Sequence, residues 1–181
     1  MVTLYKLKFT VLQQELLRFL SINAGKSFTA RALAQQLDVS SPAILKSLPL
    51  LEKEGLIVVE KDKESKRLSI ALQREDHRVI WLKRADNLKQ LYESGLVQFF
   101  YDHFPAATII LFGSYAFGED TFSSDIDIAI IGSKEKHVDL NNFEKMLERK
   151  IIVHYYLDFT KIPKHLANNI YNGITIKGAV A

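Results

Sequence analysis

The chain has 181 residues, of which 48% are hydrophobic and 25% charged, and its net charge is +3 at neutral pH. These values suit a globular protein of one or two domains, and the absence of cysteine excludes disulfides, cysteine–zinc sites and thiol catalysis. Charged residues interrupt every apolar run before it reaches membrane-spanning length, and the first residues lack the apolar core of a signal peptide, so we expect a cytoplasmic protein.

Apolar residues at helical spacing, together with cap residues, predict three helices followed by a β-hairpin in the first part of the chain. The helices run from 11 to Gly25, from 30 to 37 and from 41 to 54, and the strands cover 56–59 and 68–72. Thr29 is placed to cap the second helix and Ser41 the third, with Pro42 as its first helical residue. This order of elements resembles a winged helix-turn-helix domain, whose third helix enters the major groove of DNA.

The predicted third helix is poorly suited to reading DNA bases. It carries Lys46 and Lys53 but no Arg, Asn or Gln that could bind base edges. Pro49 lies inside it and removes one backbone hydrogen bond. At the hairpin tip, 61–66, lysines and acidic residues nearly cancel, so the tip is either simply solvated or contacts DNA phosphates without sequence readout. The surplus leucines of the helix suggest a packing surface or a homodimer instead.

A helical pattern follows over 76–103 and is broken at Gly95. We interpret it as a connector that packs on both domains. Lys83 and Arg84 are expected on a solvated face of this connector, with contact to a nucleic acid or a nucleotide tail as the alternative. Trp81 is expected to anchor the interface between the domains rather than to stack on a base.

The remainder of the chain alternates strands and helices. Predicted strands cover 107–112, 125–131 and 151–157, predicted helices cover 141–149 and 163–171, and an extended piece covers 174–178. We therefore predict an α+β protein with three parts: a winged helix domain over 1–75, a helical connector over 76–104 and a small α/β domain with a mixed sheet over 105–181.

The third part contains two motifs at the ends of neighbouring strands. The first is the turn Gly113-Ser114, which can hold phosphate oxygens through backbone N–H groups and a hydroxyl. The second is Ser124-Asp125-Ile126-Asp127, in which two aspartates one residue apart on a strand point to the same face and can bind the same metal ions. The surrounding isoleucines indicate a buried strand, where adjacent carboxylates are costly unless they are paired or metal-bound.

These motifs, in this order and spacing, resemble the nucleotidyltransferase superfamily that includes DNA polymerase β, kanamycin nucleotidyltransferase and the minimal nucleotidyltransferases of bacteria and archaea. The resemblance implies transfer of a nucleoside monophosphate, AMP in our interpretation, from a nucleoside triphosphate to an acceptor hydroxyl. It implies two Mg²⁺ ions on Asp125 and Asp127. Gly113, Ser114 and Ser124 would contact the nucleotide.

The stretch after the Gly-Ser turn departs from the family pattern. The family often has a basic residue where this chain has Phe117, so one positive group near the triphosphate would be missing. Lys134 or Lys136, after the second strand, could replace it in part. Glu119 and Asp120 are interpreted as a solvated acidic loop.

A second departure concerns the third carboxylate, which the family commonly places on the third strand. Counted from Lys150, that position is Ile152. Asp158, on the same face at the strand end, is a candidate for the third carboxylate or general base. His154 is a candidate base as well, with an ordinary packed histidine as the other interpretation.

Two functions from different classes follow. The first is a magnesium-dependent nucleotidyltransferase targeted by its winged helix domain. Its acceptor could be a protein side chain, an RNA end or a small molecule. The resemblance allows a protein acceptor in particular, because minimal members of the superfamily are often paired with a small helical toxin that they modify with AMP. The second is a DNA-binding regulator whose nucleotidyltransferase-like domain senses a nucleotide without efficient catalysis. A structural adaptor that oligomerises through the third helix is a further alternative.

Overall fold

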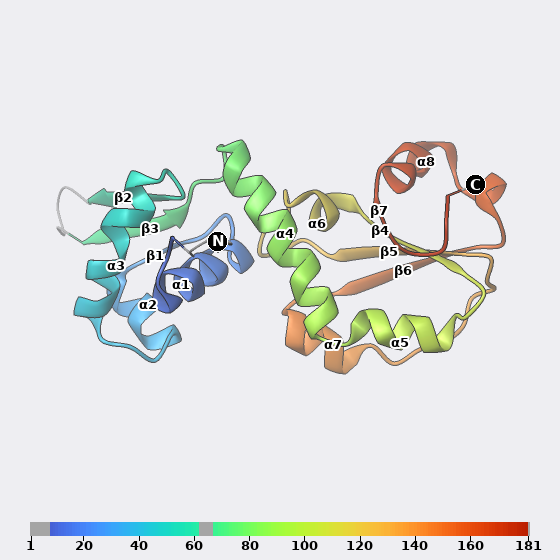
Figure 1. Cartoon of the computed structure of the whole chain (residues 1–181), viewed down its shortest axis with the longest axis horizontal. Coiled ribbons are helices and arrows are strands. Elements are labelled where there is room, and N and C mark those ends of the chain that lie inside the picture. Colours follow the sequence, from blue (N-terminus) through green and yellow to red (C-terminus); the bar gives the residue numbers. More distant parts are fainter. Residues whose placement is uncertain (1–7, 62–66, 181) are drawn as a thin grey trace, which may run out of the picture. The chain divides into compact units, whose positions relative to one another are not determined.

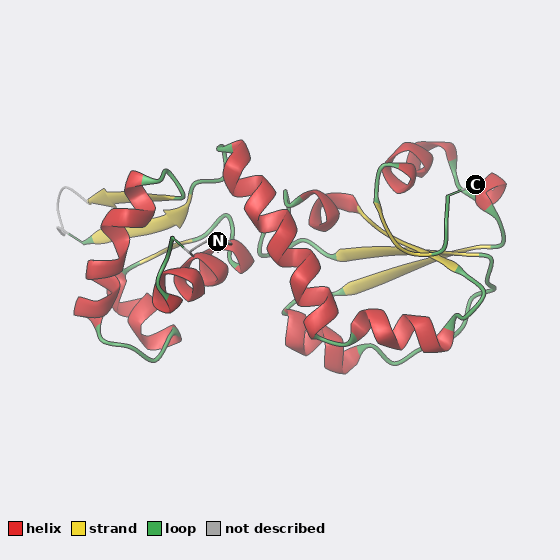
Figure 2. Ribbon diagram, in the orientation of Figure 1, coloured by secondary structure: helices red, strands yellow, loops and turns green. Residues whose placement is uncertain are grey.

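A computed structural model describes residues 8–61 and 67–180 of the chain (Figure 1). The fold divides into two units, one ending at Val79 and the other beginning at Ile80. The division falls inside helix α4 (His77–Glu93), which the sequence assigned to the connector. The predicted α+β class is confirmed, because each unit combines helices with its own sheet (Figure 2).

The first unit has the element order of a winged helix. Its elements are α1 (Val11–Ile22), β1 (Ser27–Phe28), α2 (Ala30–Gln36), α3 (Ser41–Lys53), β2 (Ile57–Lys61) and β3 (Leu68–Leu72). The strands form an antiparallel sheet in the order β1-β3-β2. Strand β1 was not predicted, since two residues are too short for an alternating pattern. Of the predicted hairpin tip, residues 62–66 lie outside the described residues.

Cap residues and buried leucines explain why the first unit folds this way. The Thr29 hydroxyl accepts a hydrogen bond from the first turn of α2, as predicted. The cap of α3 is Ser40, whose hydroxyl accepts from the Ala43 N–H, so the prediction of Ser41 was wrong by one residue. The helices and sheet bury a common core whose largest fully enclosed members are Leu16, Leu20, Leu33, Ile44, Leu51 and Ile70.

The second unit contains a four-stranded mixed sheet. After α4 its elements are α5 (Leu96–His103), β4 (Thr108–Phe112), α6 (Gly113–Phe117), β5 (Ile126–Ile131), α7 (Asn141–Leu147), β6 (Ile151–Tyr156), a 3-10 turn (Phe159–Lys161), α8 (Lys164–Tyr171) and β7 (Ile174–Lys177). The strand order is β6-β5-β4-β7; β5 and β6 are parallel and the other pairs antiparallel. The predicted mixed sheet is therefore confirmed.

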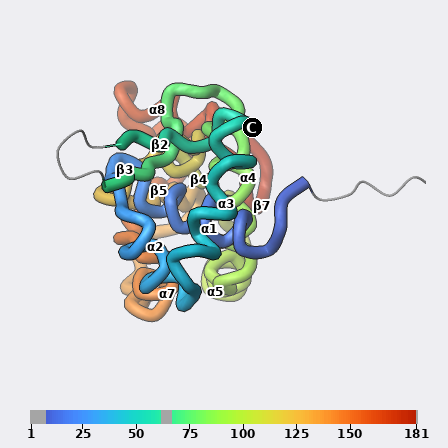
Figure 3. Tube along the Cα trace, turned by 90° about the vertical axis from the view of Figure 1, so that its left-hand side faces the viewer, coloured from blue at the N-terminus to red at the C-terminus, as the bar shows by residue number. Residues whose placement is uncertain are grey.

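Helices cover both faces of this sheet. Figures 1 and 3 show α8 on one side of the strands and α5 and α7 on the other. Along β5, Ile126, Ile128 and Ile130 belong to the core under α5 and α7. Ala129 and Ile131 belong to the smaller core under α8. Because side chains alternate along a strand, Asp127 lies on the α8 face.

Gly118 sets how closely α4 approaches α6. Its φ is +78°, and an added Cβ would lie 2.8 Å from the backbone nitrogen of Arg84. Gly95, between α4 and α5, has a similar φ of +79° but open space around the position of a Cβ. A Cβ at either glycine would strain a left-handed backbone, but only at Gly118 would it also clash with a neighbour. Substitutions at the two positions therefore separate these two costs in stability.

We expect Gly118→Ala to destabilise the protein by about 2–4 kcal/mol and Gly95→Ala by about 1 kcal/mol, since only the first adds a steric clash to a left-handed backbone. Chemical denaturation of the three proteins measures both changes. Equal losses of stability in the two variants would show that α4 does not depend on the close contact at Gly118.

None of the helices in the described part of the chain combines the length and apolarity of a membrane span.

Candidate functional site

The Gly-Ser turn and the aspartate pair meet at one end of the sheet. Phe112, the last residue of β4, pairs with Asp127 in the antiparallel register, so Gly113 directly follows this pair. Gly113 has a φ of +75°, and a Cβ added to it would lie 2.5 Å from Asp127 Oδ2. Only glycine brings the turn this close to the carboxylate. The structure thus joins Gly113, Ser114 and Asp127, which are distant in sequence.

His154 stands beside Asp127. Its Nε2 lies 3.4 Å from Asp127 Oδ1, and the two side chains are 28% and 30% exposed. The imidazole also packs against the ring of Phe112, with 5.2 Å between ring centroids. These contacts place an imidazole, which can accept a proton near neutral pH, next to a solvent-accessible carboxylate. Both interpretations of His154, as a base and as a packed histidine, are compatible with these contacts, and its role as a base stays a prediction.

The neighbour of Asp127 on the third strand is Ile152, not a carboxylate. Strands β5 and β6 are parallel, and Asp127 pairs with Ile152 in their register. The Ile152 side chain is 41% exposed. An exposed isoleucine therefore occupies the position where the resemblance would place a third acidic ligand.

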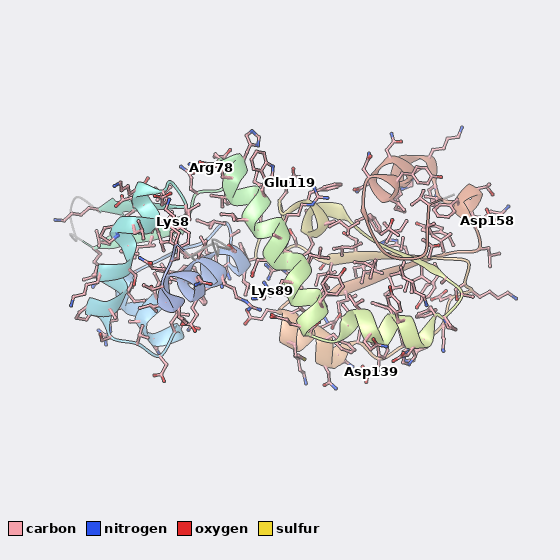
Figure 4. The ribbon with its side chains drawn as sticks, viewed as in Figure 1. Lys8, Arg78, Lys89, Glu119, Asp139 and Asp158 are labelled. Atoms are coloured by element: carbon pink, nitrogen blue, oxygen red, sulfur yellow. The ribbon has the colours of Figure 1, made fainter. Side chains whose placement is uncertain are left out.

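Asp158 is not brought to the other carboxylates. It follows the far end of β6 and caps the 3-10 turn, where its Oδ1 accepts a 2.8 Å hydrogen bond from the Thr160 N–H. A further hydrogen bond from the Thr160 side chain lowers the pKa of Asp158. Figure 4 shows Asp158 and Glu119 at opposite ends of the unit. Asp127 pairs with Ile152 near the start of β6, whereas Asp158 lies beyond the end of this strand, so its prediction as third carboxylate is wrong.

Asp125 and Ser124 immediately precede β5. Asp125 is exposed, and its charge contributes to the raised pKa of Lys150, which is raised mainly by the side-chain hydrogen bond to Glu144. Ser124 Oγ accepts a 2.9 Å hydrogen bond from the Thr121 N–H. Ser124 therefore closes the loop that leads to Asp125, and its direct contact with a nucleotide stays a prediction.

Asn169 of α8 is a member of the site that the sequence did not indicate. Its Oδ1 accepts a hydrogen bond of 3.4 Å from the Gly113 N–H. The partners are 56 residues apart, and no local pattern distinguishes this asparagine from its neighbour Asn168. Helix α8 consequently borders the turn on the same sheet face as Asp127 and His154.

A buried network centred on Asp120 supports the loop after α6. The Asp120 carboxylate forms an ion pair with Lys83, and Arg149 Nη2 donates to its Oδ2 at 3.4 Å. The three side chains are at most 4% exposed. The predictions that Asp120 and Lys83 are solvated are therefore wrong, because each provides the charge that makes burial of the other tolerable.

Asn87 extends this network to α6. Its Nδ2 donates to Asp120 Oδ1 at 2.7 Å and to the Tyr115 carbonyl at 2.9 Å. Helix α4 is thus bonded both to α6 and to the loop that leads to the aspartate pair. Trp81, on the same helix, is 65% exposed.

Lys134 and Lys136 do not lie near the Gly-Ser turn. They follow Ile131, the last residue of β5, whereas the turn adjoins the first residues of that strand. Lys136 Nζ lies 5.7 Å from the ring centroid of Phe104, before β4. Their prediction as replacements for a basic residue at position 117 is therefore wrong, since the length of the strand separates them from the site.

The carboxylates of Asp125 and Asp127 suit a magnesium ion that takes most of its ligands from water and substrate phosphates. Within 8–61 and 67–180, no group of three or more histidine, aspartate or glutamate side chains converges as a metal site. Asp125 and Asp127 offer oxygen ligands, and Mg²⁺ commonly binds one or two protein carboxylates together with water and substrate phosphates. The two aspartates therefore fit the ion without a preformed cage.

One family model matches part of the second unit. Residues 95–180 match the family model described as "Polymerase beta, Nucleotidyltransferase". This range includes the Gly-Ser turn, both aspartates and His154. No curated protein is significantly similar to the chain.

Two solved structures resemble part of the chain. One is ZitR from Lactococcus lactis, in a cysteine-substituted form, at 20% identity and a TM-score of 0.39 over 57% of this chain and 67% of that one. The other is the adhesin competence repressor AdcR from Streptococcus pyogenes, at 23% identity and a TM-score of 0.37 over 53% of this chain and 71% of that one. Both scores are low, and nothing about the function of this chain follows from them.

Proposed function

We propose that the second unit binds a nucleoside triphosphate with a divalent cation and transfers its nucleoside monophosphate to an acceptor hydroxyl. The observation that carries this proposal is the contact between the Gly113 turn and the Asp127 carboxylate. A phosphate-binding turn and a metal-binding carboxylate meet there, within the segment that matches a nucleotidyltransferase family.

Each residue has a defined part in this reaction. The Gly113 and Ser114 turn binds phosphate oxygens through N–H and hydroxyl donors. Asp125 and Asp127 would hold Mg²⁺, which supplies charge stabilisation at the phosphates. The acceptor oxygen forms a bond to the α-phosphorus, the bond to the bridging oxygen breaks, and pyrophosphate leaves. His154, 3.4 Å from Asp127, takes the proton that the acceptor hydroxyl loses.

The identity of nucleotide and acceptor rests on the resemblance to minimal nucleotidyltransferases. It favours ATP as the donor, two Mg²⁺ ions and a protein acceptor such as a small helical partner. An RNA end or a small molecule would satisfy the same chemistry. The winged helix unit would then direct the enzyme to its target.

Differential labelling of ATP tests this function. With Mg²⁺ and candidate acceptors, label at the α-phosphate should enter the acceptor, whereas label at the γ-phosphate should leave as pyrophosphate. The double variant Asp125→Asn/Asp127→Asn should lose transfer, and Asp158→Asn should retain it, because Asp158 lies at the far end of β6. Transfer that survives the double substitution would remove the aspartate pair from the reaction.

A second function is favoured by one observation, the isoleucine beside Asp127. Without a carboxylate at Ile152, the site would bind nucleotide and release it unchanged. The winged helix unit would then bind DNA according to the nucleotide state. Leu45, which is 44% exposed, lies on the helix that would enter the groove and offers no hydrogen bond to a base edge.

If this second function holds, duplex DNA binding should weaken with salt, with a slope of log affinity against log salt of about −2 to −4, because a few lysines would neutralise phosphates. Fluorescence anisotropy over about 50 to 200 mM salt measures this slope. The same titration with and without ATP and Mg²⁺ measures the effect of nucleotide on DNA affinity. Absence of duplex binding at low salt would exclude the regulator.

A further inference from the structure

The phosphate side of the proposed site lacks positive charge of its own. Helix α6 reads Gly113, Ser114, Tyr115, Ala116, Phe117, without a cation. A triphosphate brings several negative charges, and the aspartate pair adds two more. Metal ions offset part of this charge, but a cationic side chain that binds the phosphates would stabilise them further. Such a side chain would have to come from an element that neighbours α6.

Arg84 of α4 lies over α6. Its guanidinium carbon is 5.8 Å from the centroid of the Phe117 ring, a distance typical of a cation–π contact. Phe117 is three residues after Ser114, and residues at this spacing share one face of a helix. The guanidinium is thus held above the face of α6 that begins at the phosphate-binding serine. Arg84 itself is exposed and can reach a ligand.

The backbone around Arg84 is fixed on both sides. An added Cβ at Gly118 would be 2.8 Å from the Arg84 nitrogen, so the two backbones are in close contact. One residue earlier, Lys83 is anchored to Asp120, and three residues later Asn87 donates to the Tyr115 carbonyl. Because the backbone is fixed in this way, binding of a phosphate would order only the Arg84 side chain.

Other cations at this end of the sheet are committed elsewhere. Lys83 and Arg149 are buried against Asp120. Lys150 is exposed, but its Nζ donates to Glu144 Oε2 at 2.8 Å. Arg84 differs from the first two because it is exposed, and from Lys150 because its charge lies over a side chain of α6.

We propose that Arg84 binds the terminal phosphates of the nucleotide, and so replaces from α4 the positive charge that α6 lacks at Phe117. A guanidinium suits this role because it binds phosphate oxygens in a bidentate manner. The assignment rests on the proposed nucleotide site and adds a determinant of triphosphate selectivity.

Binding of ATP, ADP and AMP with Mg²⁺, measured by isothermal titration calorimetry, tests this assignment. Arg84→Gln should weaken ATP binding at least about tenfold, as expected for loss of a charged hydrogen bond, and should change AMP binding less than about twofold. Lys89→Gln, also exposed on α4, should leave both affinities unchanged. The double variant Arg84→Gln/Phe117→Arg should restore most of the ATP affinity, which a merely structural role of Arg84 would not allow.

Unchanged ATP affinity in Arg84→Gln, or equal weakening of ATP and AMP, would overturn the assignment of Arg84 while leaving the nucleotide site in place. Loss of the preference for ATP over AMP in Lys150→Gln but not in Arg84→Gln would assign the role to Lys150. Failure of the unmodified protein to bind ATP at all would overturn the proposed function and the role of Arg84 together.

Discussion

Asp127→Asn is expected to lower the rate of nucleotidyl transfer at least about 100-fold without unfolding the protein. The substitution keeps the shape of the side chain but removes the charge that would hold the cation. Metal stabilisation of the transition state amounts to several kcal/mol, and each 1.36 kcal/mol changes the rate about tenfold. Single-turnover transfer of α-labelled ATP measures the loss, and circular dichroism reports whether the fold is retained.

The position of Asp127 makes this substitution more informative than others in the site. The carboxylate borders the Gly113 turn and lies beside His154, so one change affects the proposed metal ligand and both of its neighbours. Asp139 is exposed in the loop before α7, and Asp139→Asn provides a control that changes the net charge by the same amount as Asp127→Asn. Transfer by Asp127→Asn within about threefold of the unmodified rate would contradict the assigned site.

Asp120→Ala is expected to destabilise the second unit by about 3–5 kcal/mol, the usual cost of removing one partner from a buried ion pair. Lys83 and Arg149 would remain at 3% and 4% exposure without the carboxylate that both contact. Asn87 would also lose the acceptor of its 2.7 Å hydrogen bond. Denaturant unfolding monitored by circular dichroism measures this loss.

The neighbouring residue provides the control for this experiment. Glu119 is exposed, and Glu119→Gln should change stability by less than about 0.5 kcal/mol. Similar stabilities of the Asp120 and Glu119 variants would show that the buried network contributes little. A large difference in stability would establish that Asp120 stabilises the fold, whereas the adjacent Glu119 is a solvent-exposed side chain without such a role.

Local patterns in the sequence predicted most of the architecture. Alternating isoleucines identified β5, and Gly95 was correctly placed at the break between α4 and α5. These features depend on residues close together in the chain, which is why they are visible without a structure. Strand β1 and the shift of the α3 cap to Ser40 were missed, because short elements and neighbouring serines give weak signals.

The arrangement of the candidate site depended on strand register, which local patterns do not contain. The parallel pairing of β5 with β6 places Ile152 beside Asp127 and brings His154 to its carboxylate. The same pairing places Asp158 at the far end, although its side chain shares a strand face with His154 by parity. Asp120 was misassigned for a related reason, since its cationic partners Lys83 and Arg149 are distant in sequence.

We propose that Asp125 and Asp127 hold a divalent cation against a triphosphate on the Gly113–Ser114 turn. Crystals grown with Mn²⁺ and a non-hydrolysable ATP analogue test it directly through the anomalous signal of manganese. We predict a peak about 2.0–2.3 Å from carboxylate oxygens of both aspartates, near the coordination distance of small divalent cations, with the phosphates on the turn. A nucleotide bound elsewhere, or an analogue-saturated crystal without a peak between the two aspartates, would contradict the account.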